Sequence, residues 1–208
     1  MSSILLSTAY FPPLTYFMTI LSADTVLIEM FENYQKQSYR TRCHIYGANG
    51  KQTLSIPVIK GPDLKTPITQ IKIDYSENWQ VNHLKSIESA YSSSPFLEYY
   101  IDEFRFIFEN KWEYLTELNH QILVTCLEAM QIEVKVEVTS DFIDPSAKAY
   151  LDYRYNIHPK MAVPDDLPEL KEYVQVFGEK HGFIPNLSIL DLIFNEGPNA
   201  ESFLMKNF

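Results

Sequence analysis

Residues 3–29 read SILLSTAYFPPLTYFMTILSADTVLIE, and this stretch decides the fold. Its first apolar run, Ile4 to Ser7, suits a buried strand. The Tyr-Phe-Pro-Pro sequence at residues 10–13 ends that strand, because proline cannot continue a strand ladder. A helical pattern follows over residues 14–22, and the β-branched run at 25–28 predicts a second strand. Since this connection is long enough for a crossover helix, we expect parallel strands that begin a βαβ unit.

The remainder of the chain completes the prediction of one α/β domain over residues 1–208, with a mixed β-sheet. Asn49-Gly50 is a strong turn signal between two alternating segments, so residues 34–59 predict an antiparallel hairpin. Apolar stripes at helical spacing predict three helices between residues 78 and 131. Further expected elements are a strand around Ile68, Ile71 and Ile73, a half-exposed strand at 134–138, a long loop at 144–170, a strand at 173–177 and a short helix capped by Ser188.

Composition and charge exclude several classes of protein. The 208 residues are 46% hydrophobic and 14% aromatic, which is enough for a sizeable core. The formal net charge of −10 argues against nucleic acid or an anionic membrane surface as a partner, because both attract basic proteins. No apolar run is long enough to span a bilayer, and the first residues lack the pattern of a signal peptide. We therefore expect a cytoplasmic protein.

Sequence motifs for cofactors and metals are missing. The chain has no glycine-rich phosphate loop and no dinucleotide fingerprint, and its histidines lack the spacing of metal ligands. Two cysteines, Cys43 and Cys126, make neither a disulfide framework nor a zinc site. We predict no cofactor and no metal.

A basic stripe in the hairpin region is the strongest physical signal. If residues 36–44 form one extended strand, then Lys36, Ser38, Arg40, Arg42 and His44 share a face. Three fixed cations on one face repel each other, and a bound anion relieves that repulsion. Arginine suits phosphate or carboxylate because its planar fork donates two parallel hydrogen bonds. Pairing of these cations with the many acids of the chain is the competing interpretation.

His83 is the candidate for proton transfer. It shares a helix face with Trp79 and Ile87, so it is either a hydrogen-bonded core residue or a general acid or base. Asp24, between a helix and a strand, either makes a turn or orients His83. Tyr10 follows the first strand, where ligands bind in open α/β sheets, and we predict that Tyr10 and Trp79 contact the substrate.

Cys43 offers a second chemistry, because Cys43, His83 and Asp24 are the residue types of a nucleophilic triad. The alternation of side chains along a strand argues against this hypothesis. If Arg40 and Arg42 face the ligand, then Cys43 points to the opposite face of the strand. Cys126 lies on an apolar helical stripe and is expected in the core.

Several motifs together resemble the WbqC-like family of bacterial proteins. They are YFPPLTYF at 10–17, YQKQSYRTRC at 34–43, LSIPV at 54–58, Trp79 with His83, Ile87 and Tyr91, and GFIPNLSILDL at 182–192. Members resemble proteins encoded with O-antigen and other surface-polysaccharide genes. The resemblance implies an enzyme that binds a small anionic ligand, such as a nucleotide-linked sugar, and transfers an acyl or aminoacyl group. The alternative is a non-catalytic accessory protein of the same pathway.

Overall fold

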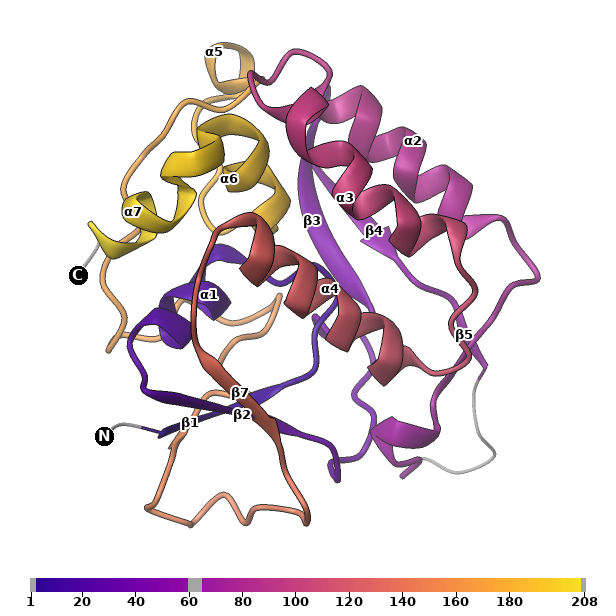
Figure 1. Ribbon diagram of the computed structural model, residues 1–208, viewed down its shortest axis with the longest axis vertical. Helices are drawn as coiled ribbons and strands as arrows, with labels where there is room; N and C mark the ends of the chain where they lie inside the picture. Colours follow the sequence, from indigo (N-terminus) through magenta and orange to yellow (C-terminus); the bar gives the residue numbers. More distant parts are fainter. Residues whose placement is uncertain (1–2, 60–64, 207–208) are drawn as a thin grey trace.

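A four-stranded parallel sheet joins the N-terminal segment to residues 135–152. In a computed structural model that describes residues 3–59 and 65–206, the strands are β1 (Ser3–Ser7), β2 (Thr25–Glu29), β7 (Lys135–Val138) and β8 (Leu151–Asp152). Their order is β7-β2-β1-β8, and every neighbouring pair is parallel (Figure 1). β1 and β2 flank helix α1 (Leu14–Leu21), so the predicted βαβ start is confirmed.

The loop between β1 and α1 is held from two sides. The Tyr10 amide donates to the carbonyl of Tyr39, and the Leu14 amide donates to the carbonyl of Leu187. Within the loop, Phe11 has a φ of 38°, a conformation that bulky residues rarely adopt. These hydrogen bonds fix the loop against two distant parts of the chain.

The predicted hairpin is confirmed, but it is shorter than expected. It consists of β3 (Arg42–Gly47) and β4 (Gly50–Ser55), joined at Ala48 and Asn49. Residues 34–41 form turns instead of a strand: Gln37 has a φ of 58°, and the Thr41 amide donates to the carbonyl of Ser38. The prediction of one continuous strand from Lys36 to His44 is therefore wrong.

Two short strands continue from the hairpin. β5 (Val58–Ile59) pairs antiparallel with β6 (Lys72–Ile73). The strand expected around residues 68–73 is correspondingly reduced, because Ile68–Gln70 form a 3-10 turn, η1.

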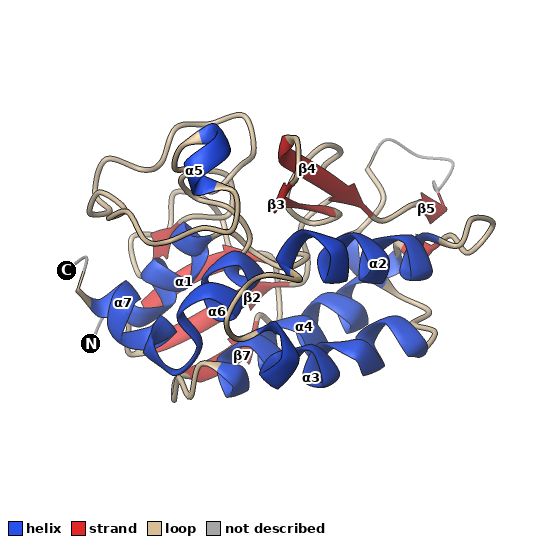
Figure 2. Cartoon of the chain, turned by 90° about the horizontal axis from the view of Figure 1, so that it is seen from above, coloured by secondary structure: helices blue, strands red, loops and turns tan. Residues whose placement is uncertain are grey.

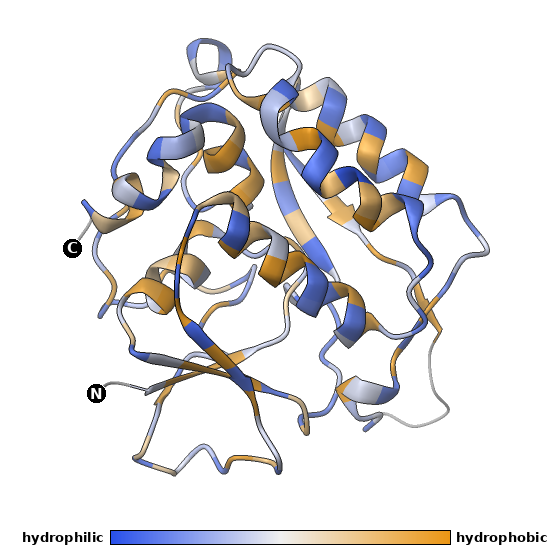
Figure 3. Cartoon of the chain, viewed as in Figure 1, coloured by the Kyte–Doolittle hydropathy of each residue, from blue (hydrophilic) through white to orange (hydrophobic). Residues whose placement is uncertain are grey.

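Three helices between the hairpin and β7 are confirmed. They are α2 (Trp79–Tyr91), α3 (Leu97–Glu109) and α4 (Leu115–Ala129). Hydrophobic and hydrophilic residues alternate along α2 and α3, which are amphipathic surface helices (Figure 3). Two perpendicular views place the parallel sheet toward one end of the molecule and the hairpin with α2 and α3 toward the other (Figures 1 and 2).

The C-terminal region mixes helices with irregular backbone. Its helices are α5 (Gly178–His181), α6 (Ile189–Glu196), η2 (Gly197–Asn199) and α7 (Ala200–Met205). Ser188 caps α6 by accepting from the Leu190 amide, as predicted. The strand predicted at 173–177 is absent from the described chain. There the Gln175 amide group bonds both the amide and the carbonyl of Ile184, which replaces a strand pairing.

One hydrophobic cluster unites the sheet, the hairpin and the helices. It includes Leu6 from β1, Phe17 from α1, Ile45 from β3, Phe104 from α3 and Leu192 from α6. The described residues contain no helix long and apolar enough to cross a membrane.

Candidate functional site

The strand order marks one place in the sheet. The chain runs from β1 to β2 and β7 on one side of β1, and then returns to place β8 on the other side. β1 and β8 therefore form a topological switch point, and ligands of open α/β sheets bind outside the carboxyl ends of the strands at such a point.

Buried ions fill this edge of the sheet. Arg154, two residues after β8, donates from Nη1 to Glu29 at the end of β2 (2.7 Å) and from Nη2 to Asp152 (2.6 Å). The side chains of Arg154 and Glu29 are both fully buried. Glu29 also accepts from the Thr139 hydroxyl and the Ile143 amide, so its oxygens are satisfied. A charge with this many partners holds the ends of the strands together.

Arg40 belongs to the same buried network. Its Nε donates to Glu32 at 2.7 Å, its Nη2 bonds the other carboxylate oxygen, and both side chains are 1% exposed. Burial raises the pKa of Glu32, and Arg40 partly offsets that rise. The ring of Tyr155 lies over the guanidinium groups of both Arg40 and Arg154, at 6.0 and 5.5 Å. Arg40 is thus paired inside the protein, as the competing interpretation expected.

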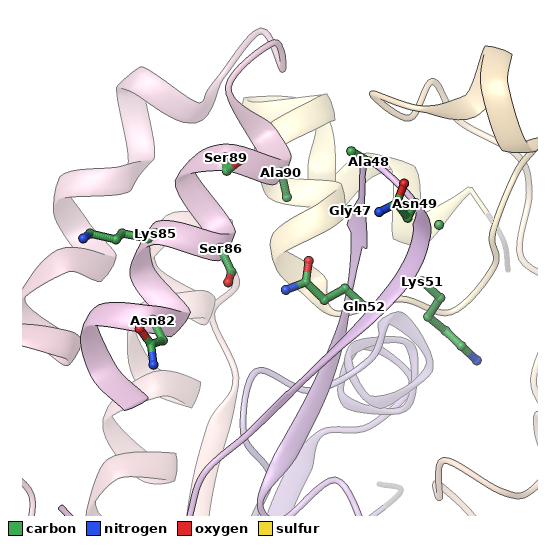
Figure 4. Close-up of a pocket in the computed structure, with 11 residues that line it drawn as sticks. Gly47, Ala48, Asn49, Lys51, Gln52, Asn82, Lys85, Ser86, Ser89 and Ala90 are labelled. Atoms are coloured by element: carbon green, nitrogen blue, oxygen red, sulfur yellow. The ribbon is translucent and has the colours of Figure 1, made fainter. Parts of the chain in front are cut away.

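The two faces of the hairpin have different surroundings. Figure 4 shows Gln52 of β4 pointing toward Asn82 and Ser86 of α2, and Lys51 pointing to the opposite side. Register places Tyr46 opposite Lys51, and His44 and Arg42 follow on the same face because side chains alternate along a strand. Arg42 and His44 therefore lie on the face away from α2.

Five side chains make up what we call the basic face: Arg42, His44, Lys51, His158 and Lys160. Arg42 is partly buried, and its buried Nε has no hydrogen-bond partner among the described residues. Burial, together with Lys51 and Arg42, lowers the pKa of His44 to about 4. Burial, together with Arg40, Arg42 and Lys160, lowers the pKa of His158.

The charges that act on the imidazoles of this face are positive. Within residues 3–59 and 65–206, no ion pair involves Arg42, Lys51 or Lys160. Such a concentration of unpaired positive charge stands out in a chain whose net charge is −10. Lys36 lies exposed in the preceding turn, where the neighbouring Gln37 accepts a hydrogen bond from Lys160.

His83 occupies a different environment. It is 7% exposed on α2, and its Nδ1 is 2.8 Å from the hydroxyl of Tyr10. Burial lowers the pKa of His83 to about 4, and a hydrogen bond to the Ser55 backbone opposes that shift. Trp79 packs edge-to-face on the same imidazole. Tyr10, His83 and Trp79 lie together on the α2 side of the hairpin, and Arg42 lies on its other face.

Asp24 is far from these groups. It directly precedes β2, at the amino edge of the sheet, whereas Tyr10 follows β1 at the carboxyl edge. A five-residue strand separates the two edges by roughly 16 Å. The structure does not bring Asp24 to His83.

Cys43 is enclosed on the core side of β3. It is fully buried, and burial raises the pKa of its thiol. A thiol of this kind is not a ready nucleophile, because the thiolate is the reactive form. Cys126 is also fully buried, as predicted.

A polar cleft of about 740 Å³ lies between the hairpin tip and α2 (Figure 4). Neutral side chains such as Asn49, Gln52 and Asn82 line it, together with Lys51 and Lys85. No lining residue has a buried polar atom without a partner within the described chain. We assign it no ligand.

The sequence interpretation missed His158, Lys160 and Arg154, which all lie in the loop expected at 144–170. The signal was the run YRYNIHPK at 153–160, where basic and aromatic residues concentrate in an otherwise acidic C-terminal part. The described residues contain no group of three or more His, Cys, Asp or Glu that could hold a metal ion.

These observations define an α/β protein with a parallel sheet, a buried ion network at its carboxyl edge and an unpaired basic face. The chain belongs to the WbqC-like protein family, whose model matches residues 8–163. It is also 26% identical over 220 residues to the uncharacterised protein Rv1507c of Mycobacterium tuberculosis, covering 94% of each chain. No solved structure matches the sequence. The family match spans all five residues of the basic face.

Proposed function

We propose that the protein binds an anionic, nucleotide-linked sugar through its phosphates on the basic face. The observation that supports this most is Arg42: among the described residues, its buried Nε has no hydrogen-bond partner and its guanidinium forms no ion pair. Burying an unsatisfied donor costs about 1–3 kcal/mol, and a bound anion removes that cost.

The imidazole of His158 suits the same ligand. Its Nδ1 accepts from the Lys160 amide at 3.2 Å, so the neutral ring carries its proton on Nε2 and can donate from there. Each charge-assisted hydrogen bond contributes roughly 1.5–3 kcal/mol, so three of them are consistent with micromolar affinity, about −8 kcal/mol. Lys36 remains a predicted additional contact, and Arg40 takes a positioning role behind the face.

On the basis of the family resemblance, we propose that the protein acts in surface-polysaccharide biosynthesis of the O-antigen type. In the enzymatic form of the proposal, the protein transfers an acyl or aminoacyl group to the sugar. Proton transfer then falls to His44 or His158, which line the basic face, and not to His83 with Asp24.

A non-catalytic binding role is the second candidate, and one observation favours it. The pKa of His44 is lowered to about 4, and that of His158 is lowered too. General bases work best when their pKa is near the operating pH. Both imidazoles are therefore weak bases in the free protein, and catalysis requires that the bound anion raise their pKa values.

Calorimetric titration with UDP-glucose and with pyrophosphate tests the binding. We expect affinity to fall with added NaCl, because the attraction is electrostatic. Arg42→Gln should weaken binding about 10- to 150-fold, the equivalent of one charge-assisted bond. The matched control is Arg105→Gln, which removes an arginine that already has Glu88 and Asp102 as partners. Equal affinities of the two variants would remove the basic face as the binding site.

NMR titration of the imidazole protons separates the two candidate functions. The enzymatic form requires the pKa of His44 or His158 to rise toward neutrality when pyrophosphate is bound, and either His44→Gln or His158→Gln should abolish turnover. Mass spectrometry of UDP-glucose incubated with acetyl-coenzyme A measures acyl transfer as a gain in mass. Tight binding without any pKa rise or mass gain would support the non-catalytic role.

A further inference from the structure

A cavity of about 150 Å³ lies on the α4 side of the parallel sheet, separate from the basic face. Its walls are residues at the carboxyl ends of β1, β2 and β7 and one face of α4. Apolar side chains such as Ala9, Ile28 and Leu123 make up most of the lining, and the exposed His120 is also part of its wall. The cavity lies at the carboxyl edge of the sheet, on the β2 side of β1, and the switch point lies on the β8 side.

One polar atom in this lining has no partner. Asn119 of α4 is 1% exposed, and its Oδ1 is buried without a hydrogen bond among the described residues. Its Nδ2 donates to the carbonyl of Arg40 at 2.9 Å. Because that carbonyl can only accept, the amino group must face Arg40, which leaves Oδ1 as an open acceptor. A buried acceptor left unsatisfied costs about 5- to 150-fold in the equilibrium constant for folding.

We propose that this cavity is a binding site for a neutral, mostly apolar small molecule with one hydrogen-bond donor. A volume near 150 Å³ accommodates a molecule the size of benzene. Asn119 Oδ1 selects for a hydroxyl or amide N–H on that molecule. Since no Lys, Arg, Asp or Glu of the described residues lines the cavity, a neutral ligand is favoured over an ion. The inference does not depend on the basic face or on the proposed function.

Water is a weaker occupant. A buried water needs two to four polar partners, and the polar groups of the wall are Asn119, His120 and the hydroxyls of Thr8, Tyr16 and Thr116. The Tyr16 hydroxyl already donates to the Ser7 carbonyl, and apolar side chains make up the rest of the wall. An apolar group that fills the remaining space makes dispersion contacts that water cannot make.

Phenol and benzene test the site, because they differ by one hydroxyl. Binding followed by amide chemical shifts of the intact protein should be about 2- to 12-fold tighter for phenol, the worth of one neutral hydrogen bond. Asn119→Leu should abolish that preference. Leu123→Phe should block both probes by filling the cavity while leaving the bond from Asn119 to Arg40 in place, and Glu117→Gln, on the exposed face of α4, should change neither affinity.

The two probes test the role of Asn119 and the existence of the site separately. Equal binding of phenol and benzene would refute the role of Asn119, and failure of both probes to shift cavity residues would refute the site itself. If Asn119→Leu does not fold, the Leu123→Phe variant alone decides whether the probes occupy this cavity. Pyrophosphate affinity should be unchanged in Leu123→Phe, which distinguishes this site from the basic face.

Discussion

Removing Arg40 should destabilise the protein rather than abolish ligand binding. Arg40 and Glu32 are each 1% exposed and share two hydrogen bonds, so Arg40→Met leaves a carboxylate buried without its partner. Breaking a buried ion pair from one side costs about 3–5 kcal/mol. For a chain of this size, each kcal/mol corresponds to roughly 2–4 °C, so the midpoint of thermal unfolding should fall by about 6–20 °C.

A double-mutant cycle in urea provides the measurement. The double variant Glu32→Leu/Arg40→Met replaces both charges with apolar groups and should recover most of the lost free energy of unfolding. Arg105→Met is the control, because Arg105 is 41% exposed and its surface pairs contribute at most about 1 kcal/mol. A double variant as unstable as the sum of the two single variants would refute the argument.

The same variant has a pH signature. Burial raises the pKa of Glu32 even when Arg40 is present, and in Arg40→Met only the smaller effect of Arg154 opposes that rise. A carboxyl with a raised folded-state pKa contributes its stability below the unfolded value, about 4.3. The deficit of Arg40→Met should therefore be smallest near pH 4 and should grow as the pH rises through the folded pKa.

Two further predictions concern stability. The pKa values of His44 and His83 are lowered to about 4, so both contribute stability above the unfolded pKa that is lost as pH falls from about 6.5 toward 4. The loss is up to about 1.4 kcal/mol per pH unit for each histidine. In His83→Gln, the free energy of unfolding measured in urea should therefore fall less steeply as the pH is lowered from 6.5 to 4. At Gly197, φ is 53° and a Cβ would lie 2.5 Å from the Phe96 ring, so Gly197→Ala should cost about 2–5 kcal/mol. Gly182→Ala is its control: φ is 78° with open space around the Cβ, so calorimetry should record only the backbone strain of about 1–2 kcal/mol.

Local patterns were sufficient for the framework of the fold. The βαβ start followed from an apolar run, a Pro-Pro break and a β-branched run, all within residues 3–29. The hairpin turn followed from Asn49-Gly50, where Gly50 adopts a φ of 97° that favours glycine. Each of these features is decided by residues close together in the sequence.

The candidate site depended on contacts between distant residues, and there the pattern failed. The alternation at residues 36–44 was compatible with a strand, but the turn at Gln37 and the pairing of Arg40 with Glu32 override it. His158 and Lys160 lie near Arg42 although more than a hundred residues separate them in the sequence. A local sequence pattern cannot predict such a long-range contact. At 173–177 an apolar alternation predicted a strand, and the Gln175 side chain satisfied the backbone of Ile184 instead.

The hydrogen bonds of the loop between β1 and α1 connect the N-terminal segment to the C-terminal region. The Leu14 amide donates to the Leu187 carbonyl and the Ile189 amide donates to the Pro12 carbonyl, and Leu187 and Ile189 both lie beyond residues 8–163, which the family model matches. Cleavage after residue 163 would strip both bonds from the segment that ends in the first helix. The last forty residues therefore hold the first fifteen in place through these backbone hydrogen bonds. We expect the two segments to unfold in one transition.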